Sequence, residues 1–162
     1  MKKINILGVG NALVDKQFLI EDSFLEDISI DKGTMGLCKS NYQEELYKKL
    51  SKHYKKSQDA CGGSATNTIF AASSLGSSCG FIGKVANDTN GHFYKEDLEK
   101  IGIQNNIISK GKENTGTCLI MISPDAERTM STCLGISADL NFSDIDENLI
   151  NNSEIIYLSL IH

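Results

Sequence analysis

A pair of glycines opens the segment Gly62-Gly63-Ser64-Ala65-Thr66-Asn67, which leads directly into an expected helix. Glycine has no Cβ, so the backbone can adopt a positive φ angle and a ligand can approach its amide groups closely. The helix start beyond it offers unpaired N–H groups and a positive dipole end to a polar ligand. Asn67 adds a donor and an acceptor in the first turn. The residues alone leave two interpretations open, a polar-ligand site and a tight turn with close helix packing.

Two charged side chains are further candidates for chemistry. Asp15 lies in an otherwise apolar stretch, where a carboxylate is unusual. It either caps a turn or accepts hydrogen bonds from vicinal hydroxyls, for which a carboxylate is well suited. Arg128 lies in the second arm of an expected hairpin. It either forms a surface ion pair with Glu127 or Asp125, or binds a phosphate group.

Other classes of site and partner are disfavoured. Gly8-Val9-Gly10 lacks the third glycine of a dinucleotide-binding fingerprint, since Leu13 stands there and a strand pattern follows. The three histidines are scattered and the five cysteines show no C-x-x-C spacing, so we expect no metal site. A net charge of −5 disfavours nucleic acid as a partner. No apolar stretch approaches membrane-spanning length, and reduced thiols are typical of a cytoplasmic protein.

Strand and helix patterns alternate along the chain. A length of 162 residues with 40% hydrophobic content predicts one domain with a single core. The expected strands are 4–9, 12–20, 34–38, 80–85, 115–122, 127–133 and 155–158, and the expected helices are 41–53, 66–75, 89–101 and 143–150. This alternation predicts an α/β fold with a parallel sheet, and the hairpin-like pieces predict a small second sheet that could act as a lid.

Taken together, the ordered motifs resemble the ribokinase-like (PfkB) carbohydrate kinase family, and its adenosine-kinase-like branch in particular. The resemblance covers nearly the whole chain and implies a parallel-sheet core with a small β-sheet lid near 12–20, 33–38 and 115–133. The motifs that carry it are Gly8-Val9-Gly10-Asn11-Ala12-Leu13-Val14-Asp15, Lys32-Gly33-Thr34-Met35, Gly62-Gly63-Ser64-Ala65-Thr66-Asn67-Thr68, Phe81-Ile82-Gly83-Lys84-Val85, Thr115-Gly116-Thr117-Cys118 and Pro124-Asp125-Ala126-Glu127-Arg128-Thr129-Met130.

The resemblance implies a role for each candidate residue. The positions that match substrate-binding residues of the family are Asn11, Asp15, Met35, Gly62, Gly63, Asn67, Cys118 and Met130. Asp15, with Asn11 beside it, is expected to hold sugar hydroxyls, and Asn67 to hydrogen-bond the sugar. The two glycines are expected to let the lid close. The methionines and Cys118 are expected to line the base, and Arg128 to help close the site around the transferred phosphate.

The implied reaction is transfer of the ATP γ-phosphoryl group to a primary hydroxyl of a nucleoside or sugar, with Mg²⁺ bridging the phosphates. Adenosine is favoured over a simple sugar, because Met35, Cys118 and Met130 make an apolar wall suited to a base. The resemblance also implies a small-molecule partner and a homodimer through lid strands. A ribokinase- or fructokinase-like sugar kinase is the alternative.

The family's D-T-x-G-A-G-D motif, which holds its catalytic base and anion hole, does not occur in this sequence. We therefore expect residues 1–162 to be the N-terminal part of one kinase domain, with the catalytic base and most ATP contacts outside it. A truncated or frameshifted product, or a partial sequence, is the corresponding hypothesis. The alternative function is that of a non-catalytic fragment that binds the substrate weakly.

Overall fold

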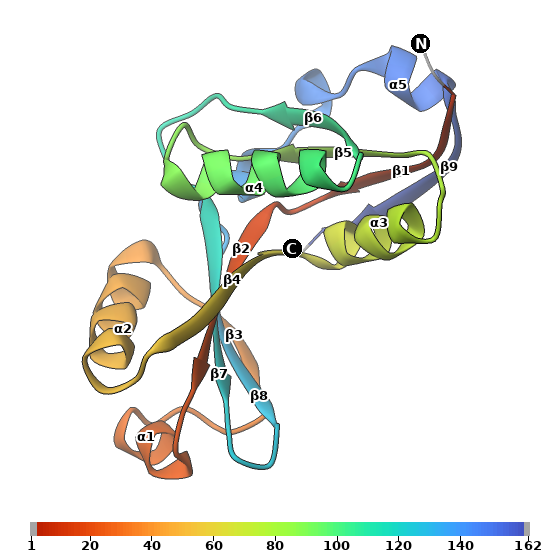
Figure 1. Ribbon diagram of the computed structural model, residues 1–162. Helices are drawn as coiled ribbons and strands as arrows, with labels where there is room; N and C mark the ends of the chain where they lie inside the picture. The colour runs from red at the N-terminus through yellow and green to blue at the C-terminus, as the bar shows by residue number, and fades with distance from the viewer. Residues whose placement is uncertain (1–2, 161–162) are drawn as a thin grey trace. The chain divides into compact units, whose positions relative to one another are not determined.

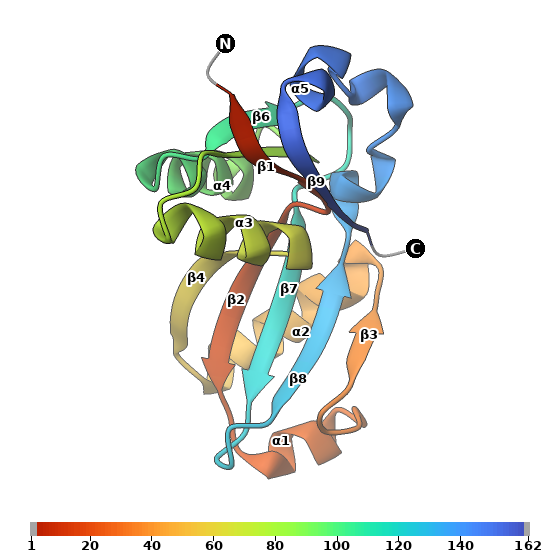
Figure 2. The same cartoon turned by 90° about the vertical axis from the view of Figure 1, so that its right-hand side faces the viewer.

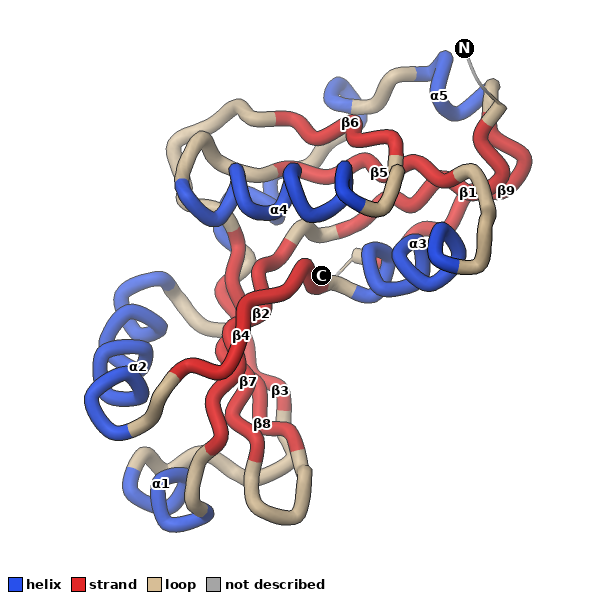
Figure 3. Tube along the Cα trace, in the orientation of Figure 1, coloured by secondary structure: helices blue, strands red, loops and turns tan. Residues whose placement is uncertain are grey.

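The computed structural model describes residues 3–160 and divides the chain into two compact units (Figures 1 and 3). Unit 1 contains the residues up to Val14, then Cys61–Gly116, then the residues from Leu134 onward, and unit 2 contains Asp15–Ala60 and Thr117–Cys133. In chain order the elements are β1 (Ile4–Gly10), β2 (Leu13–Leu19), α1 (Asp22–Asp27), β3 (Met35–Leu37), α2 (Ser40–His53), β4 (Lys56–Gly62), α3 (Ser64–Ser74), β5 (Cys79–Lys84), α4 (Thr89–Lys100), β6 (Gln104–Ile108), β7 (Gly116–Ile122), β8 (Arg128–Cys133), the 3-10 helices η1 (Gly135–Asp139) and η2 (Phe142–Asp144), α5 (Glu147–Asn151) and β9 (Ser153–Ser159).

Unit 1 is built on a parallel four-stranded sheet in the order β6-β5-β1-β9. The two central strands, β1 and β5, are largely buried on both faces, so they read as mainly apolar runs rather than alternating ones. On one face, Ile69 of α3 and Tyr94 of α4 pack against Phe81. On the other face, Leu149 of α5 packs against Leu7 and neighbouring strand residues. Successive side chains of a strand point to opposite faces of the sheet, so neighbouring residues such as Phe81 and Ile82 pack against different helical layers.

Unit 2 is built around a five-stranded sheet in the order β3-β8-β7-β2-β4. In Figure 2 the sheet faces the viewer and α2 lies behind it. Leu46 and Leu50 of α2 pack against Phe18, Leu119 and Met121 of the sheet to form this unit's core. These residues define the face of the sheet that α2 covers.

The predicted α/β fold, with a parallel sheet and a second sheet, is confirmed. The second sheet has one more strand than expected, because the polar residues of β4 show no alternation that would predict a strand. Three further short elements, α1, β6 and η1, are likewise not predicted. The single helix expected over 143–150 is wrong: the chain forms η2 and then α5. The reason is local, since the Asp146 side chain accepts a hydrogen bond from the Asn148 amide and starts a new helix.

Within residues 3–160, none of the helices combines the length and the apolar character that a membrane crossing requires.

Candidate functional site

The candidate residues fall into two groups that belong to different units. Unit 2 holds the side chains expected to recognise a ligand, which are Asp15, Met35, Cys118, Arg128 and Met130. Unit 1 holds the glycine pair and the two asparagines, which are Gly62, Gly63, Asn11 and Asn67. Each group has its own geometry.

The unit 2 group lies on one face of one sheet. Strands β7 and β8 pair so that Ile120 lies opposite Met130 and Ile122 opposite Arg128, while Met35 of β3 lies beside Met130 on the other side. These residues alternate along their strands with those that pack against α2, so they point to the opposite face of the sheet.

The same parity places two more candidates on this face. Leu119 and Phe18 both pack on the side of the sheet that α2 covers. Cys118 is one residue from Leu119 and Asp15 is three residues from Phe18, so both point to the other side. We call the face that carries Asp15, Met35, Cys118, Arg128 and Met130 the open face of unit 2. The viewer looks onto it in Figure 2.

Asp15 is the electrostatic centre of the open face. Burial raises the pKa of its carboxyl from 3.8 to about 6, and the positive charge of Arg128 opposes that rise. A carboxylate with a pKa near 6 is charged at neutral pH, although its surroundings favour the neutral form. A ligand that donates hydrogen bonds to it would relieve that cost, as vicinal hydroxyls would.

The Cys118 thiol behaves as an apolar group. Burial raises its pKa to about 11, although the hydroxyl of Thr132 donates a hydrogen bond to its Sγ at 3.2 Å. At neutral pH it is therefore a neutral thiol and a poor nucleophile. Together with exposed Met35 and half-buried Met130, it gives this part of the open face a soft, polarisable surface.

Asp125, one of the two ion-pair partners suggested for Arg128, pairs with Lys32 instead. Lys32 binds the Asp125 carboxylate at 2.8 Å and also binds Asp22 at 2.9 Å. Arg128 is exposed, and it acts on the Asp15 carboxyl through its charge.

In unit 1 the glycine pair makes a turn that another residue could not make without strain. Gly63 is the N-cap of α3 and has a φ angle of +97°, in the region that favours glycine. A Cβ at this position would lie 2.4 Å from the carbonyl oxygen of Asn11. The structure therefore brings Gly63 and Asn11 into direct contact, as close packing of the glycine turn requires.

A buried tyrosine fixes this turn, and its role is not predicted from the sequence. The hydroxyl of Tyr94, on α4, lies 2.5 Å from Oγ1 of Thr66 and donates to the carbonyl oxygen of Gly62 at 3.4 Å. Both Tyr94 and Thr66 are fully buried. From the sequence Tyr94 appears only as part of the apolar stripe of a helix, because nothing there indicates where its hydroxyl points.

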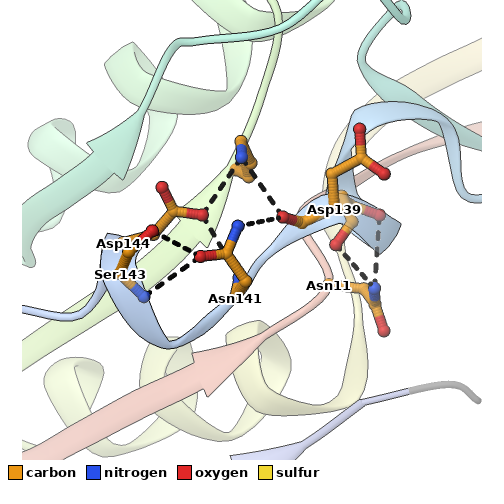
Figure 4. A network of polar contacts seen from close by, with 7 residues as sticks. Asn11, Asp139, Asn141, Ser143 and Asp144 are labelled. Atoms are coloured by element: carbon orange, nitrogen blue, oxygen red, sulfur yellow. Dashed lines mark hydrogen bonds and ion pairs between the residues drawn. The ribbon is translucent and has the colours of Figure 1, made fainter.

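Asn11 is buried, and a second segment of unit 1 orients it. Its side-chain amide nitrogen donates to the carbonyl oxygen of Ser137 at 3.1 Å and to the Ser137 hydroxyl at 3.3 Å (Figure 4). Asn67, by contrast, is exposed in the first turn of α3, where its backbone N–H donates to the carbonyl of Gly63 at 2.9 Å.

Metal ligation is not indicated within residues 3–160, where no group of three or more His, Cys, Asp or Glu side chains could hold an ion. The chemistry that the two groups offer is recognition. Unit 2 presents a carboxylate with a raised pKa beside soft apolar side chains, and unit 1 presents a tight glycine turn beside a fixed asparagine.

The chain is similar to known kinases. The family model described as pfkB family carbohydrate kinase matches residues 35–162. The 5-dehydro-2-deoxygluconokinase of Clostridium beijerinckii is 36% identical over 136 residues, which cover 82% of this chain and 37% of that protein.

Two solved structures have the same fold. The crystal structure of adenosine kinase from Sinorhizobium meliloti matches with a TM-score of 0.88 and 32% identity, over 96% of this chain and 47% of that one. A probable sugar kinase protein from Rhizobium etli matches with a TM-score of 0.88 and 31% identity, over 98% of this chain and 47% of that one. The chain thus spans about half the length of these structures and 30–37% of the curated kinases it matches.

Proposed function

This chain belongs to the pfkB family of carbohydrate kinases, and we propose that it supplies the acceptor-binding residues for transfer of a phosphoryl group from ATP to a nucleoside or sugar hydroxyl. The two units are proposed to be parts of one kinase domain. The sequence holds no D-T-x-G-A-G-D segment, and we propose no catalytic base among its residues.

The observation that carries the proposal is the arrangement of the open face of unit 2. A carboxylate whose pKa is raised to about 6 shares this face with Met35, Cys118 and Met130. The carboxylate suits the hydroxyls of a sugar ring, and the thioether and thiol groups suit the flat apolar surface of a base. A nucleoside carries both groups, and adenosine is the acceptor that we propose first.

The guanidinium of Arg128, the first residue of β8, lies on the same open face. Arg128 precedes Met130 by two positions in β8, so the alternation of the strand places its guanidinium on the side of the sheet that carries Asp15. A guanidinium can contact two phosphate oxygens at once. Arg128 is therefore proposed to neutralise charge on the phosphoryl group that is transferred.

The candidate residues of unit 1 are also proposed to bind an acceptor. Asn11 and Asn67 would hydrogen-bond its hydroxyls, and Gly62 and Gly63 would let the ligand approach the backbone. ATP is the proposed phosphoryl donor, and Mg²⁺ would screen its phosphates. Because no cluster of possible metal ligands occurs in residues 3–160, no step of the proposal depends on a metal held by these residues.

A sugar acid is the second candidate acceptor. The relative with 36% identity over 82% of this chain is named a 5-dehydro-2-deoxygluconokinase. Such a ligand also offers vicinal hydroxyls to Asp15, but it has no base to occupy the surface formed by Met35 and Met130. The two acceptors therefore differ in their dependence on the methionines.

Calorimetric titration of the 162-residue chain with adenosine and with 5-dehydro-2-deoxygluconate tests the proposal. We expect adenosine to bind more tightly. Asp15→Asn is expected to weaken binding about tenfold or more, because it removes a charged acceptor. Met130→Ala is expected to weaken adenosine binding and leave the sugar acid unaffected.

Asp125→Asn is the matched control, since Asp125 is an exposed carboxylate of the same unit. Equal binding by Asp15→Asn and the unchanged chain would contradict the role given to Asp15. Tighter binding of the sugar acid would reverse the order of the two substrates. Phosphorylation of either compound by this chain alone would show that a catalytic base lies among its residues.

Two further parts of the proposal concern location and assembly. All five cysteines are free thiols, which supports a reducing compartment such as the cytoplasm. A homodimer formed through strands of unit 2 stays a prediction, and sedimentation velocity measures it directly.

A further inference from the structure

A buried lysine on β5 takes no part in the chemistry described so far. Lys84 is the last residue of the strand and is only 6% exposed. Its Nζ lies 3.0 Å from Oδ2 of Asp144, and it donates to the carbonyl oxygen of Asp139 at 3.2 Å. The paired side chains are 8% and 12% exposed, so both charges are mostly withdrawn from water.

A buried ion pair of this kind contributes little net free energy to folding. Removing two charges from water costs several kcal/mol, and their attraction roughly returns that amount. An apolar pair of similar volume often serves stability equally well. What a hydrogen-bonded ion pair adds is a fixed geometry for the segment that carries its partners.

The segment that Lys84 holds is Gly135–Asp144, which contains the 3-10 helices η1 and η2. Figure 4 shows how its polar groups are linked. The side-chain nitrogen of Asn141 donates to the same Asp139 carbonyl at 3.1 Å, and the backbone N–H of Asn141 donates to the Asp144 carboxylate at 3.2 Å. The lysine therefore links Asp139, the last residue of η1, to Asp144, the last residue of η2.

The other end of this network is a candidate site residue. Ser137 lies two positions before Asp139 in η1, and both of its oxygens accept hydrogen bonds from the Asn11 side chain. The Ser137 hydroxyl in turn donates to Leu134, which fixes its own orientation. Displacing η1 would move both acceptors that orient the Asn11 amide.

We propose that Lys84 is a positioning residue, which holds η1 in place so that Ser137 orients Asn11 for the acceptor. The proposal rests on the proposed function for its consequence in binding, but the coupling between Lys84 and Asn11 is a property of unit 1 alone. The proposal gives a role to the buried charge of Lys84, which has no other role in the candidate site.

The first experiment measures the coupling without any ligand. In ¹⁵N-labelled chain, the side-chain amide protons of Asn11 are expected to exchange slowly with solvent. Lys84→Met is expected to speed their exchange several-fold and to shift the Asn11 side-chain resonance. Lys95→Met is the matched control, because the Lys95 side chain lies in the same unit and donates to Ser109, which is not part of η1. Unchanged Asn11 signals in folded Lys84→Met would overturn the proposal.

If Lys84→Met does not fold, the double variant Lys84→Met/Asp144→Leu replaces the ion pair by an apolar pair and removes the unpaired charge. It still lacks the bond to the Asp139 carbonyl. It is therefore expected to show the same fast exchange at Asn11 in a folded chain. Slow exchange in this variant would equally overturn the proposal.

The second experiment is a double-mutant cycle on adenosine binding. Lys84→Met is expected to weaken binding about five- to tenfold in the unchanged background and to have no effect on Asn11→Ala, since both changes act through one amide. Additive effects would show that Lys84 acts on stability only. If the unchanged chain does not bind adenosine, the proposed substrate is wrong, and the exchange measurement still decides the role of Lys84.

Discussion

The two units build their parts of the candidate site in different ways. In unit 2 the candidates are side chains that project from one face of a sheet, and the sheet would form without them. In unit 1, apart from exposed Asn67, the candidates are two glycine backbone positions and the buried side-chain amide of Asn11, and the local fold depends on them. Gly63 contacts the Asn11 carbonyl, and Asn11 contacts η1.

This difference predicts opposite responses to substitution. A change on the open face of unit 2 alters recognition while keeping or raising stability, because the carboxylate there is held in surroundings that disfavour its charge. A change at the glycine turn of unit 1 lowers stability and recognition together. Three variants test the comparison, in order of expected effect.

The largest effect is expected for Gly63→Ala. The new methyl group would lie 2.4 Å from the Asn11 carbonyl oxygen, in a backbone conformation that alanine rarely adopts. We expect the free energy of unfolding to fall by about 3–5 kcal/mol. Urea denaturation followed by circular dichroism measures this change.

Gly76→Ala is the matched control for this variant. Gly76 has a similar φ angle of +94°, but a Cβ there would have no heavy atom within 4 Å. Its substitution is expected to cost only about 1–2 kcal/mol, the penalty of the backbone conformation alone. Equal losses at the two glycines would show that contact with Asn11 does not make Gly63 special.

The second effect is a gain of stability in unit 2. The pKa of Asp15 rises from 3.8 in the unfolded chain to about 6 in the folded one, because the carboxyl is buried. At neutral pH the Asp15 carboxyl is ionised in both states, and its ionised form costs more free energy in the folded state than in the unfolded state. Asp15→Asn is expected to raise the free energy of unfolding by about 1–3 kcal/mol at pH 7, while it weakens acceptor binding.

The sign of the pH dependence makes this prediction specific. Between about pH 6 and 3.8 the folded state of the unchanged chain takes up the proton first, so its stability rises relative to the variant as the pH falls. The advantage of Asp15→Asn is expected to disappear below pH 3.8. Asp125→Asn provides the contrast, because Lys32 lowers the pKa of Asp125 and its substitution should not stabilise the chain. A constant advantage of Asp15→Asn across this range would show that burial does not perturb its titration.

The sequence predicts the open face of unit 2 better than it predicts the glycine turn. Asp15 stands out because a carboxylate interrupts an apolar run, and the alternation along strands fixes which residues share a face. The open face can therefore be assembled from local pattern and strand pairing. The glycine pair is also visible in the sequence, but what it contacts is not.

The missing information is long-range. Tyr94 and Lys84 fit into predicted elements without any sign of their hydrogen bonds, since their partners lie 28 to 60 residues away along the chain. Strand β4 is missed for a related reason, because pairing in the sheet stabilises a segment whose own residues are polar. Local pattern thus predicts elements and faces, whereas the groups that fix the site depend on which elements meet.

The smallest effect is expected for Tyr94→Phe, which separates the hydroxyl from the ring. The ring packs against Phe81 in the core of unit 1 with its centroid 6.1 Å away, and phenylalanine keeps this contact. The hydroxyl bonds to Thr66 and Gly62 are lost, which leaves buried polar atoms without that partner. We expect a loss of about 1–2 kcal/mol in the free energy of unfolding.

The location of this loss distinguishes a local anchor from general packing. Because the hydroxyl holds the glycine turn, amide exchange in Tyr94→Phe is expected to increase at Gly63 through Asn67 and to stay unchanged along β5. Tyr42→Phe serves as the control, since Tyr42 is 47% exposed on α2. Faster exchange spread evenly over unit 1 would mean that the hydroxyl stabilises the unit as a whole. The contrast between a unit whose site depends on its backbone and one whose site is set by side chains would then have to rest on Gly63 alone.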